Sequence, residues 1–428
     1  MKVIFDVSVF GAARRWSAAG IYRVADNLAR ALNSSGKCSL EFSAASLDLH
    51  YYALKHLEAA SKLGEICFPH SAWRYQVYSK YLTADQRASA AGGFQKLGWV
   101  LARKLLHRSA VMLHPPTVSE ASLKRADIFH SLYYAVPSHA RGRKNLSVFI
   151  TVHDIIPILY PQYFDEIDPG TPHFLKIIID GIQVEDWVIC VSQKTKEDLC
   201  NYRKDLDPRR VFVTHLGASN WFHPCDDAAI IKKACSKYRI PEGRYVLSLC
   251  TLEPRKNLAH LVRCFTRLVR QEPLSDLRLV LAGGLGWQYE SIFQELTGAD
   301  GTIRERIILT GRVADEDMAA LYSGATAFVY PSLYEGFGLP PLEAMQCGTP
   351  VITSNTSSLP EVVGNAGIMV DPHDIDGLCQ AMLQLATKPD LRQSMSQKSL
   401  EQAARFSWKR CADQTLAAYA TAVNRKDK

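Results

Sequence analysis

Short apolar runs alternate with longer segments of helical periodicity along most of the chain, and this alternation restricts the fold more than any other feature. The pattern is typical of parallel sheets whose strands are joined by crossover helices. The predicted strands fall into two sets: Lys2–Val9, Asp127–Leu132, Ser147–Val152, Trp187–Val191 and Val211–His215, then Tyr245–Leu249, Arg278–Ala282, Arg306–Leu309, Ala327–Tyr330 and Pro350–Thr353. A polar segment with prolines and Gly243, Trp221–Arg244, separates the two sets.

The two sets predict two open α/β domains. At 428 residues the chain is long enough for both. We expect a first domain at 1–220, a linker at 221–243, a second domain at 244–405, and a helix within 406–428 that packs back across the boundary. Because such sheets bind ligands at the carboxyl ends of their strands, we expect the site in a cleft between the domains.

The composition narrows the class of protein. With 47% hydrophobic and 22% charged residues, the chain is neither disordered, collagenous nor a coiled coil. The 11 cysteines show no Cys-x-x-Cys pair and no zinc spacing, as in a cytosolic protein with reduced thiols. The first apolar stretch is interrupted at Asp6 and predicts a strand, not a signal peptide. No run approaches the roughly 18 apolar residues that cross a bilayer, so we expect a cytoplasmic protein, at most peripheral on the inner face of the plasma membrane.

Residues 51–110 carry most of the net charge of +7, with nine Lys or Arg against three Asp or Glu. Within them, an apolar stripe is formed by Phe94, Leu97, Leu101 and Leu105. A helix of this kind can lie on an anionic membrane. It can equally pack on its own domain with its basic face in solvent, and the sequence leaves both interpretations open.

A glycine-bearing loop follows the predicted strand that ends at Tyr330. Gly336 and Gly338 allow a ligand close to the backbone, and two prolines mark the first turn of a helix, so the free N–H groups there favour a phosphate. Glu335 and Glu343 would repel a phosphate, which points them to a sugar or a ribose. The alternatives are a solvated loop residue for Glu335 and a complement to the helix dipole for Glu343.

A second polar segment, Cys250–Asn257, also lies between a predicted strand and a helix. Arg255 and Lys256 would neutralise a diphosphate there. The alternative is a solvated basic helix start, but cations at that end oppose the helix dipole, which favours a functional role.

Taken together, the ordered motifs resemble the retaining GT-B glycosyltransferases of the GT4 type. They are Thr-Leu-Glu-Pro-Arg-Lys-Asn at 251–257, Leu-Ala-Gly-Gly-Leu-Gly-Trp at 281–287, Val-Tyr-Pro-Ser at 329–332 and the E-x7-E pair around Gly-Phe-Gly-Leu-Pro. The match is strongest over 244–380 and looser before it. The resemblance implies the GT-B architecture, two Rossmann-like domains whose parallel sheets face each other across a cleft.

The resemblance also implies roles for residues of the second half. Lys256 and Arg255 hold the donor diphosphate, Glu335 binds hydroxyls of the transferred sugar, and Glu343 takes the ribose hydroxyls. The other implied donor contacts are the backbone of Gly336, Phe337, Gly338 and Leu339 at the phosphate or sugar, and Arg312 and Val313 near the base. Many members carry an arginine where this chain has Thr251, so either Arg255 compensates or the N-terminal loop supplies a cation.

In the first half, His153 and Asp154 follow a predicted strand and resemble the family's contact to the donor sugar. The alternative is a packed or solvated histidine beside a helix-capping Asp154. Gly20 resembles the glycine of the loop after the first strand, which approaches the donor phosphate and the acceptor, and Arg23 follows it on the acceptor side. We also expect His130 at this cleft edge, with a structural role equally open.

The resemblance implies a same-face substitution without a metal or other cofactor, in which a donor phosphate oxygen takes the acceptor proton. No motif supplies the carboxylate nucleophile of a two-step reaction, so stabilisation of the leaving diphosphate carries the catalysis. Asp-x-Asp pairs, the signature of metal-dependent transferases of another fold, occur at 205/207, 315/317 and 374/376. Asp315 and Asp374 each open a predicted helix, and we interpret them as caps.

We therefore expect a hexosyltransferase that uses GDP-mannose, or alternatively UDP-glucose or another nucleotide sugar, and a saccharide acceptor, lipid-linked, in bacterial surface polysaccharide synthesis. A dinucleotide-dependent oxidoreductase is disfavoured because no strand is followed by G-x-G-x-x-G. A non-catalytic nucleic-acid- or membrane-binding protein is the other alternative. The chain has no aromatic stacking motif or zinc module, so we expect no nucleic acid partner.

Overall fold

The computed structural model describes residues 1–12, 20–44, 53, 80–81, 83–84, 87, 93–111, 118–164, 170–298 and 300–425. Within them, the strands form two parallel six-stranded sheets, ordered β2-β1-β3-β4-β5-β6 and β12-β11-β10-β7-β8-β9. The first sheet contains β1 (Lys2–Asp6), β2 (Ser39–Ser43), β3 (Ile128–Ser131), β4 (Ser147–Val152), β5 (Trp187–Cys190) and β6 (Val211–Val213). The second contains β7 (Tyr245–Leu249), β8 (Arg278–Ala282), β9 (Ile307–Gly311), β10 (Ala327–Tyr330), β11 (Val351–Ser354) and β12 (Gly367–Val370).

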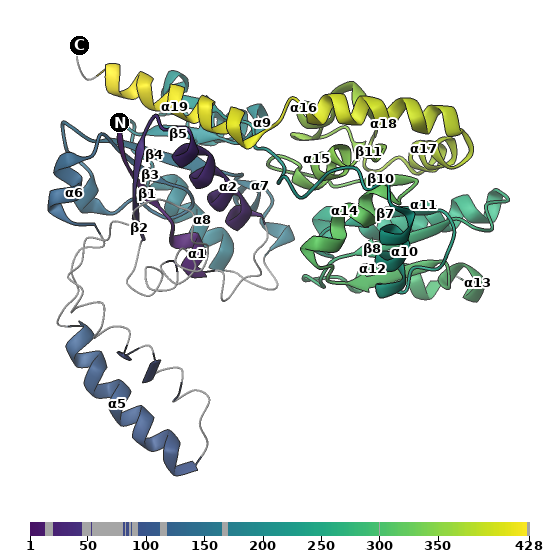
Figure 1. Cartoon of the computed structure of the whole chain (residues 1–428), viewed down its shortest axis with the longest axis horizontal. Helices are drawn as coiled ribbons and strands as arrows, with labels where there is room; N and C mark the ends of the chain where they lie inside the picture. Colours follow the sequence, from purple (N-terminus) through teal and green to yellow (C-terminus); the bar gives the residue numbers. More distant parts are fainter. Residues whose placement is uncertain are drawn as a thin grey trace.

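The two sheets confirm the predicted α/β fold with two Rossmann-like domains (Figure 1). The predicted strands are all present, with ends that differ by up to three residues. Two strands, β2 and β12, were not predicted, and both are edge strands with partly exposed residues. β2 lacks the continuous apolar run that marks a strand covered on both faces, such as β7, and β12 has an apolar run of only four residues that begins with glycine.

Helices connect the strands. In the first domain they are α1 (Ser8–Ala12), α2 (Ile21–Ser34), α5 (Gly93–Val111), α6 (Glu120–Arg125), α7 (Ile156–Leu159), α8 (Gly170–Asp180) and α9 (Gln193–Tyr202). In the second domain and after it they are α10 (Ala228–Lys237), α11 (Leu258–Gln271), α12 (Glu290–Gly298), α13 (Gly301–Arg304), α14 (Asp315–Ser323), α15 (Leu339–Gln346), α16 (Leu359–Val363), α17 (Ile375–Thr387), α18 (Pro389–Ala403) and α19 (Trp408–Asn424). Among the described helices, none is long and apolar enough to cross a membrane.

The last helix returns to the first domain. Figure 1 shows α19, in yellow, running along the first sheet's side of the molecule beside α2. Its Tyr419 hydroxyl lies 2.5 Å from His130 Nδ1, and Gln414 accepts a hydrogen bond of 3.2 Å from His215 N. The chain therefore crosses between the domains twice.

The segment 221–243, expected to be a linker, contains α10. Asp227 caps this helix through a 2.8 Å bond from Ala229 N. At its other end, Lys237 and Tyr238 bond Asp317 of α14 at 2.6 and 2.7 Å. The helix thus belongs to the second domain, and only the residues before it connect the domains. The prolines and acids that flank this short helix concealed it in the sequence.

Candidate active site

Glu335 is the centre of a buried polar cluster after β10. Its Oε1 accepts hydrogen bonds from Lys256 Nζ at 2.6 Å, Ser332 Oγ at 2.7 Å and Tyr330 Oη at 2.8 Å, and its Oε2 lies 2.9 Å from Arg255 Nη1. Burial alone would raise the pKa of Glu335, but the charges of Arg255 and Lys256 outweigh it and lower the pKa to about 2. The structure thus brings together the three residues expected at the diphosphate and sugar, with the carboxylate ionised.

Arg255 is shared between two carboxylates. Its Nη2 pairs with Glu253 Oε1 at 2.6 Å, and its Nη1 also donates to the Tyr334 carbonyl at 2.7 Å. Burial opposes its charge, but Glu335 and Glu253 raise the pKa of the guanidinium, which stays charged. Arg255 Nε is buried and has no hydrogen-bond partner among the described residues. That N–H is therefore a buried donor beside the carboxylates without an acceptor in the described part of the chain.

The loop after Glu335 contacts the first domain at Gly336. A Cβ at Gly336 would lie 2.2 Å from the His153 carbonyl oxygen and 2.9 Å from Asp154 Cβ. Ser192 Oγ and Thr195 Oγ1, at the start of α9, donate to the Gly336 carbonyl at 2.6 and 3.0 Å. Only glycine fits this contact, so the loop joins the end of β4 directly to the Glu335 cluster.

His153 and Asp154 therefore lie at the cleft, as expected. His153 Nε2 is 3.0 Å from the Leu132 carbonyl, which can only accept, so Nε2 carries the proton and Nδ1 is an acceptor. Burial lowers the pKa of His153 to about 4 and raises that of Asp154. Both residues line a cavity of about 180 Å³ with Arg255, Tyr133 and other side chains of the first domain.

Glu343 lies in the second turn of α15, whose N-cap is Gly338 at a φ of 114°. Its Oε1 is 3.3 Å from Arg23 Nη1, and its Oε2 accepts from the Tyr322 hydroxyl at 3.3 Å. Burial raises the pKa of Glu343, and Arg23 opposes that shift. Because dipole effects fall off within the first turn, the dipole alternative for Glu343 loses its geometric basis.

The other predicted donor residues differ in their surroundings. Gly20 precedes α2 with a φ of 61°, and Leu339 begins α15. Arg312 and Thr251 are exposed, whereas Val313 is buried. Phe337 is also buried, and its ring packs near those of His215 and Phe406, so of this residue only the backbone is left for a ligand.

The expectation that His130 faces an acceptor is wrong. The ring is fully buried, with Nδ1 at 2.5 Å from Tyr419 Oη and Nε2 at 2.8 Å from Thr151 Oγ1. Burial lowers the pKa of His130 to about 3, so the ring is neutral. The residue lies inside β3, within the predicted strand Asp127–Leu132, and Tyr419 of α19 packs against it.

Asp374 and Asp315, both expected to be helix caps, each bond a partner within the protein. Asp374 caps α17 through Gly377 N at 2.9 Å. Asp315, expected to be a cap, is instead the first residue of α14 and pairs with Arg23 at 2.6 Å, while Ala314 occupies the cap position. Within the described residues, no group of three or more His, Cys, Asp or Glu side chains is arranged to hold a metal ion.

The geometry agrees with the comparisons to known proteins. Residues 232–402 match the family of glycosyl transferases group 1. The O-antigen chain mannosyltransferase B of Escherichia coli is 33% identical over 371 residues, which are 86% of this chain and 93% of that protein. The chain belongs to the group 1 glycosyltransferases. The serotype-specific mannosyltransferase WbdA of Escherichia coli is also 33% identical, over 60% of this chain and 31% of that longer protein.

Solved structures confirm the GT-B fold of this group 1 glycosyltransferase. Anabaena HepE, solved in complex with UDP and glucose, superposes with a TM-score of 0.64 at 15% identity, over 98% of this chain and 100% of that one. WaaG, a glycosyltransferase involved in lipopolysaccharide biosynthesis, superposes with a TM-score of 0.59 at 12% identity, over 98% of both chains.

Sequence reasoning missed several polar partners of this glycosyltransferase site: Glu253, Tyr330, Ser332, Ser192 and Thr195. The first three lie inside the quoted motifs. Their position beside Glu335 and Arg255 could therefore have been predicted, because the motifs follow neighbouring strand ends. The last two form an ordinary helix cap, since Ser192 Oγ also accepts from Thr195 N. Their contact with Gly336 depends on how the domains meet.

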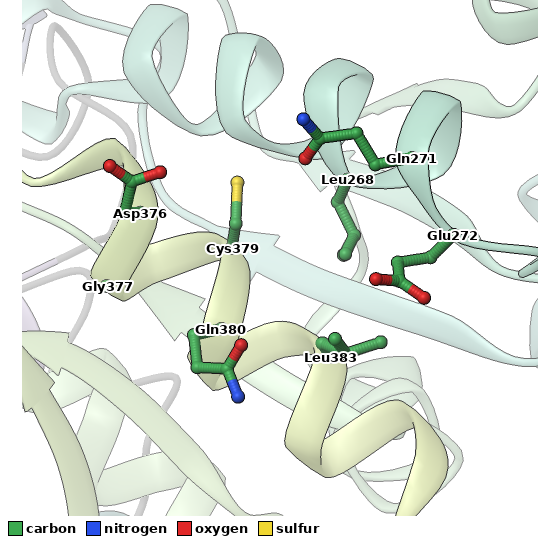
Figure 2. Close-up of a pocket in the computed structure, with 8 residues that line it drawn as sticks. All are labelled: Leu268, Gln271, Glu272, Asp376, Gly377, Cys379, Gln380 and Leu383. Atoms are coloured by element: carbon green, nitrogen blue, oxygen red, sulfur yellow. The ribbon is translucent and has the colours of Figure 1, made fainter.

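A second cavity, of about 430 Å³, lies between α11 and α17 of the glycosyltransferase (Figure 2). Figure 2 shows Cys379 pointing toward α11 and Leu268 pointing toward α17. The groove contains none of the residues expected at the donor site.

Proposed function

We propose that this glycosyltransferase moves a hexose, with retention, from a nucleotide sugar to a saccharide acceptor that is lipid-linked, in bacterial surface polysaccharide synthesis. The observation that carries the proposal is the Glu335–Lys256–Arg255 cluster, joined through Gly336 to His153. The mannosyltransferase names of its relatives favour GDP-mannose. The UDP-glucose complex of HepE keeps UDP-glucose as the alternative.

The environment of Glu335 argues against a two-step reaction. A carboxylate with four partners and a pKa of about 2 is a poor nucleophile and a poor base. In the proposed step, the bond from the anomeric carbon to the diphosphate breaks. The acceptor oxygen then bonds the same face, and its proton passes to a phosphate oxygen of the leaving group. Lys256 and Arg255 stabilise the charge that develops there, with no metal in the scheme.

The two domains supply complementary groups for the sugar. Glu335 is ionised and accepts hydrogen bonds from sugar hydroxyls, whereas the Nε–H of Arg255 can donate. The neutral ring of His153 offers Nδ1 as a further acceptor from the opposite side. This arrangement suits a neutral, hydroxyl-rich group bound next to an anion.

The test is a transfer and hydrolysis screen over GDP- and UDP-sugars with the wild type, Lys256→Ala and Glu335→Ala. Both variants should lose nearly all turnover while circular dichroism shows a folded chain. Lys237→Ala, which removes a cation from a surface pair with Asp317, is the matched control and should keep full turnover. Near-normal transfer by both site variants would remove the assigned site, and RNA binding without nucleotide binding would favour the non-catalytic alternative.

The exposed face of α5 supports peripheral binding to an anionic bilayer at the cytoplasmic face. Figure 1 shows α5 projecting away from the first sheet. Leu97, Leu101 and Leu105 are 61%, 55% and 71% exposed, and Lys96 and Lys104 on the same helix are exposed too. Exposed leucines beside lysines fit the boundary between anionic headgroups and acyl chains. Most of the basic stretch at 51–92 lies outside the described residues.

Co-sedimentation tests this membrane proposal. The wild type should pellet with vesicles that contain anionic phosphatidylglycerol and not with pure phosphatidylcholine, and Leu97→Ser with Leu101→Ser should reduce the pelleted fraction. Leu285→Ser, at a leucine of the second domain that is 57% exposed, is the control. Equal binding by the double variant and the wild type would contradict a role for α5.

A further inference from the structure

One arginine of the first domain contacts two acids of the second. Arg23 lies in the first turn of α2, and its Nη2 is 2.6 Å from Asp315 Oδ1. Its Nη1 is 3.3 Å from Glu343 Oε1. Asp315 begins α14 and Glu343 belongs to α15, so a single guanidinium bridges the two domains.

The two contacts differ in strength. The bond to Asp315 is short, whereas the 3.3 Å contact with Glu343 exceeds the roughly 2.7–2.9 Å of a strong charge-assisted hydrogen bond. Glu343 is the more buried acid, at 8% exposure of its side chain against 43% for Asp315. The contact with Glu343 is therefore the one that a ligand can replace, while Asp315 retains the arginine.

We infer that Arg23 and the ribose of the nucleotide donor compete for Glu343, so that the Arg23–Glu343 contact is a latch that donor binding opens. The inference rests on the proposed function, with the ribose hydroxyls at Glu343 as the family resemblance implies. Hydroxyls donate hydrogen bonds to Oε1 as the guanidinium does. Because Oε1 is buried, a bond from a ribose hydroxyl weakens the bond from Arg23, and the reverse holds too. Arg23 stays on Asp315, which acts as its positioning residue.

Competition has a measurable signature. When only a fraction of the protein has Glu343 available, the apparent dissociation constant of a ribonucleotide is the intrinsic one divided by that fraction. Removing Arg23 makes the whole population competent and tightens binding. A nucleotide without the 2′- and 3′-hydroxyls does not compete for Glu343, so its affinity is independent of the latch.

Calorimetric titrations with GDP and 2′,3′-dideoxy-GDP, and with the corresponding uridine pair, test the latch. Arg23→Gln should bind the ribonucleotide about fivefold more tightly, the factor that corresponds to roughly 1 kcal/mol, and should bind the dideoxy analogue as the wild type does. Arg30→Gln, on the same helix and paired with Asp26 one turn away, is the matched control and should change neither. Equal weakening of both ligands by Arg23→Gln would place Arg23 at the diphosphate, and no change in either would exclude competition.

X-ray scattering without nucleotide separates the latch from the proposed function. Arg23→Gln and Asp315→Asn should both increase the radius of gyration, because each removes a contact between the domains, whereas Arg30→Gln should not. If no nucleotide binds the wild type, the proposed function fails, and the scattering still shows whether the Arg23 contacts hold the two domains together. Equal radii of gyration for the wild type and both latch variants would overturn the latch.

Discussion

The carbonyl oxygen of His153 lies against Gly336, at a distance where a Cβ on Gly336 would come within 2.2 Å of it. His153 directly follows β4 of the first sheet, and Gly336 follows Glu335 in the second domain. The contact therefore fixes how the two domains are positioned on either side of the candidate donor site.

Gly336→Ala should prevent this approach without unfolding either domain. The two atoms in conflict are backbone atoms or a Cβ, which cannot rotate away, so the domains must separate. We expect turnover to fall about a hundredfold, since a displacement of about 1 Å costs that much in an enzyme, while nucleotide affinity changes little. Steady-state kinetics and calorimetry measure the two effects.

The control for this variant is Gly298→Ala, at a glycine of α12 where an added Cβ meets no atom within 4 Å. It should keep wild-type turnover. Wild-type turnover in Gly336→Ala as well would show that the His153–Gly336 contact is not required during the reaction.

The contrast between Glu335 and His130 shows what the sequence could predict. Residues next to strand ends, such as Glu335, Lys256 and His153, were found because parallel strands share one binding edge. His130 was misplaced because nothing local reveals that Tyr419 lies on the ring. Contacts between segments far apart in the chain depend on domain packing, which local patterns do not encode.

The burial of a strand decided whether the sequence revealed it. Central strands such as β4 are buried at every residue and form continuous apolar runs. The edge strand β2 reads Ser-Leu-Glu-Phe-Ser, with its first three residues at least partly exposed, and carries no such signal. Short helix α10 was concealed because its flanking prolines and acids outweigh ten residues of periodicity.

Tyr330→Phe should impair turnover more than binding. The hydroxyl lies 2.8 Å from both Lys256 Nζ and Glu335 Oε1, so it positions the pair that we assign to the donor. We expect kcat to fall about tenfold with KM nearly unchanged, and stability to fall by about 1 kcal/mol for the lost hydrogen bonds. A purely structural role would lower stability and leave kcat intact, so kinetics and denaturant unfolding together decide. Tyr245→Phe, at a buried hydroxyl that bonds the Leu321 carbonyl away from this cluster, is the control.

Tyr419→Phe should reduce stability without altering nucleotide binding. It leaves His130 Nδ1 buried without its 2.5 Å partner, which costs about 1–3 kcal/mol. Because His130 is neutral, with a pKa of about 3, the loss should be the same from pH 6 to pH 8. Thermal unfolding at several pH values measures it. A change in acceptor affinity with stability intact would contradict the structural role that we assign to His130.

Asp6→Asn should stabilise the protein near neutral pH. Asp6 ends β1 and is 2% exposed, and burial raises its pKa from 3.8 to about 6, although Ser8 N donates to Oδ1 at 2.9 Å. Since the folded pKa is the higher one, the folded state binds more protons between pH 4 and 6, and stability falls as the pH rises through that window. Asparagine keeps the hydrogen-bond acceptor and removes this loss of stability, so we expect a gain of about 1–3 kcal/mol at pH 7.

Asp276→Asn is the control of opposite sign, because the hydrogen bond from Arg244 lowers the pKa of Asp276 to about 2 and its stabilisation disappears as the pH falls. Unfolding curves from pH 4 to 8 should therefore change in slope only for Asp6→Asn, and an unchanged slope would show that Asp6 is already ionised without cost.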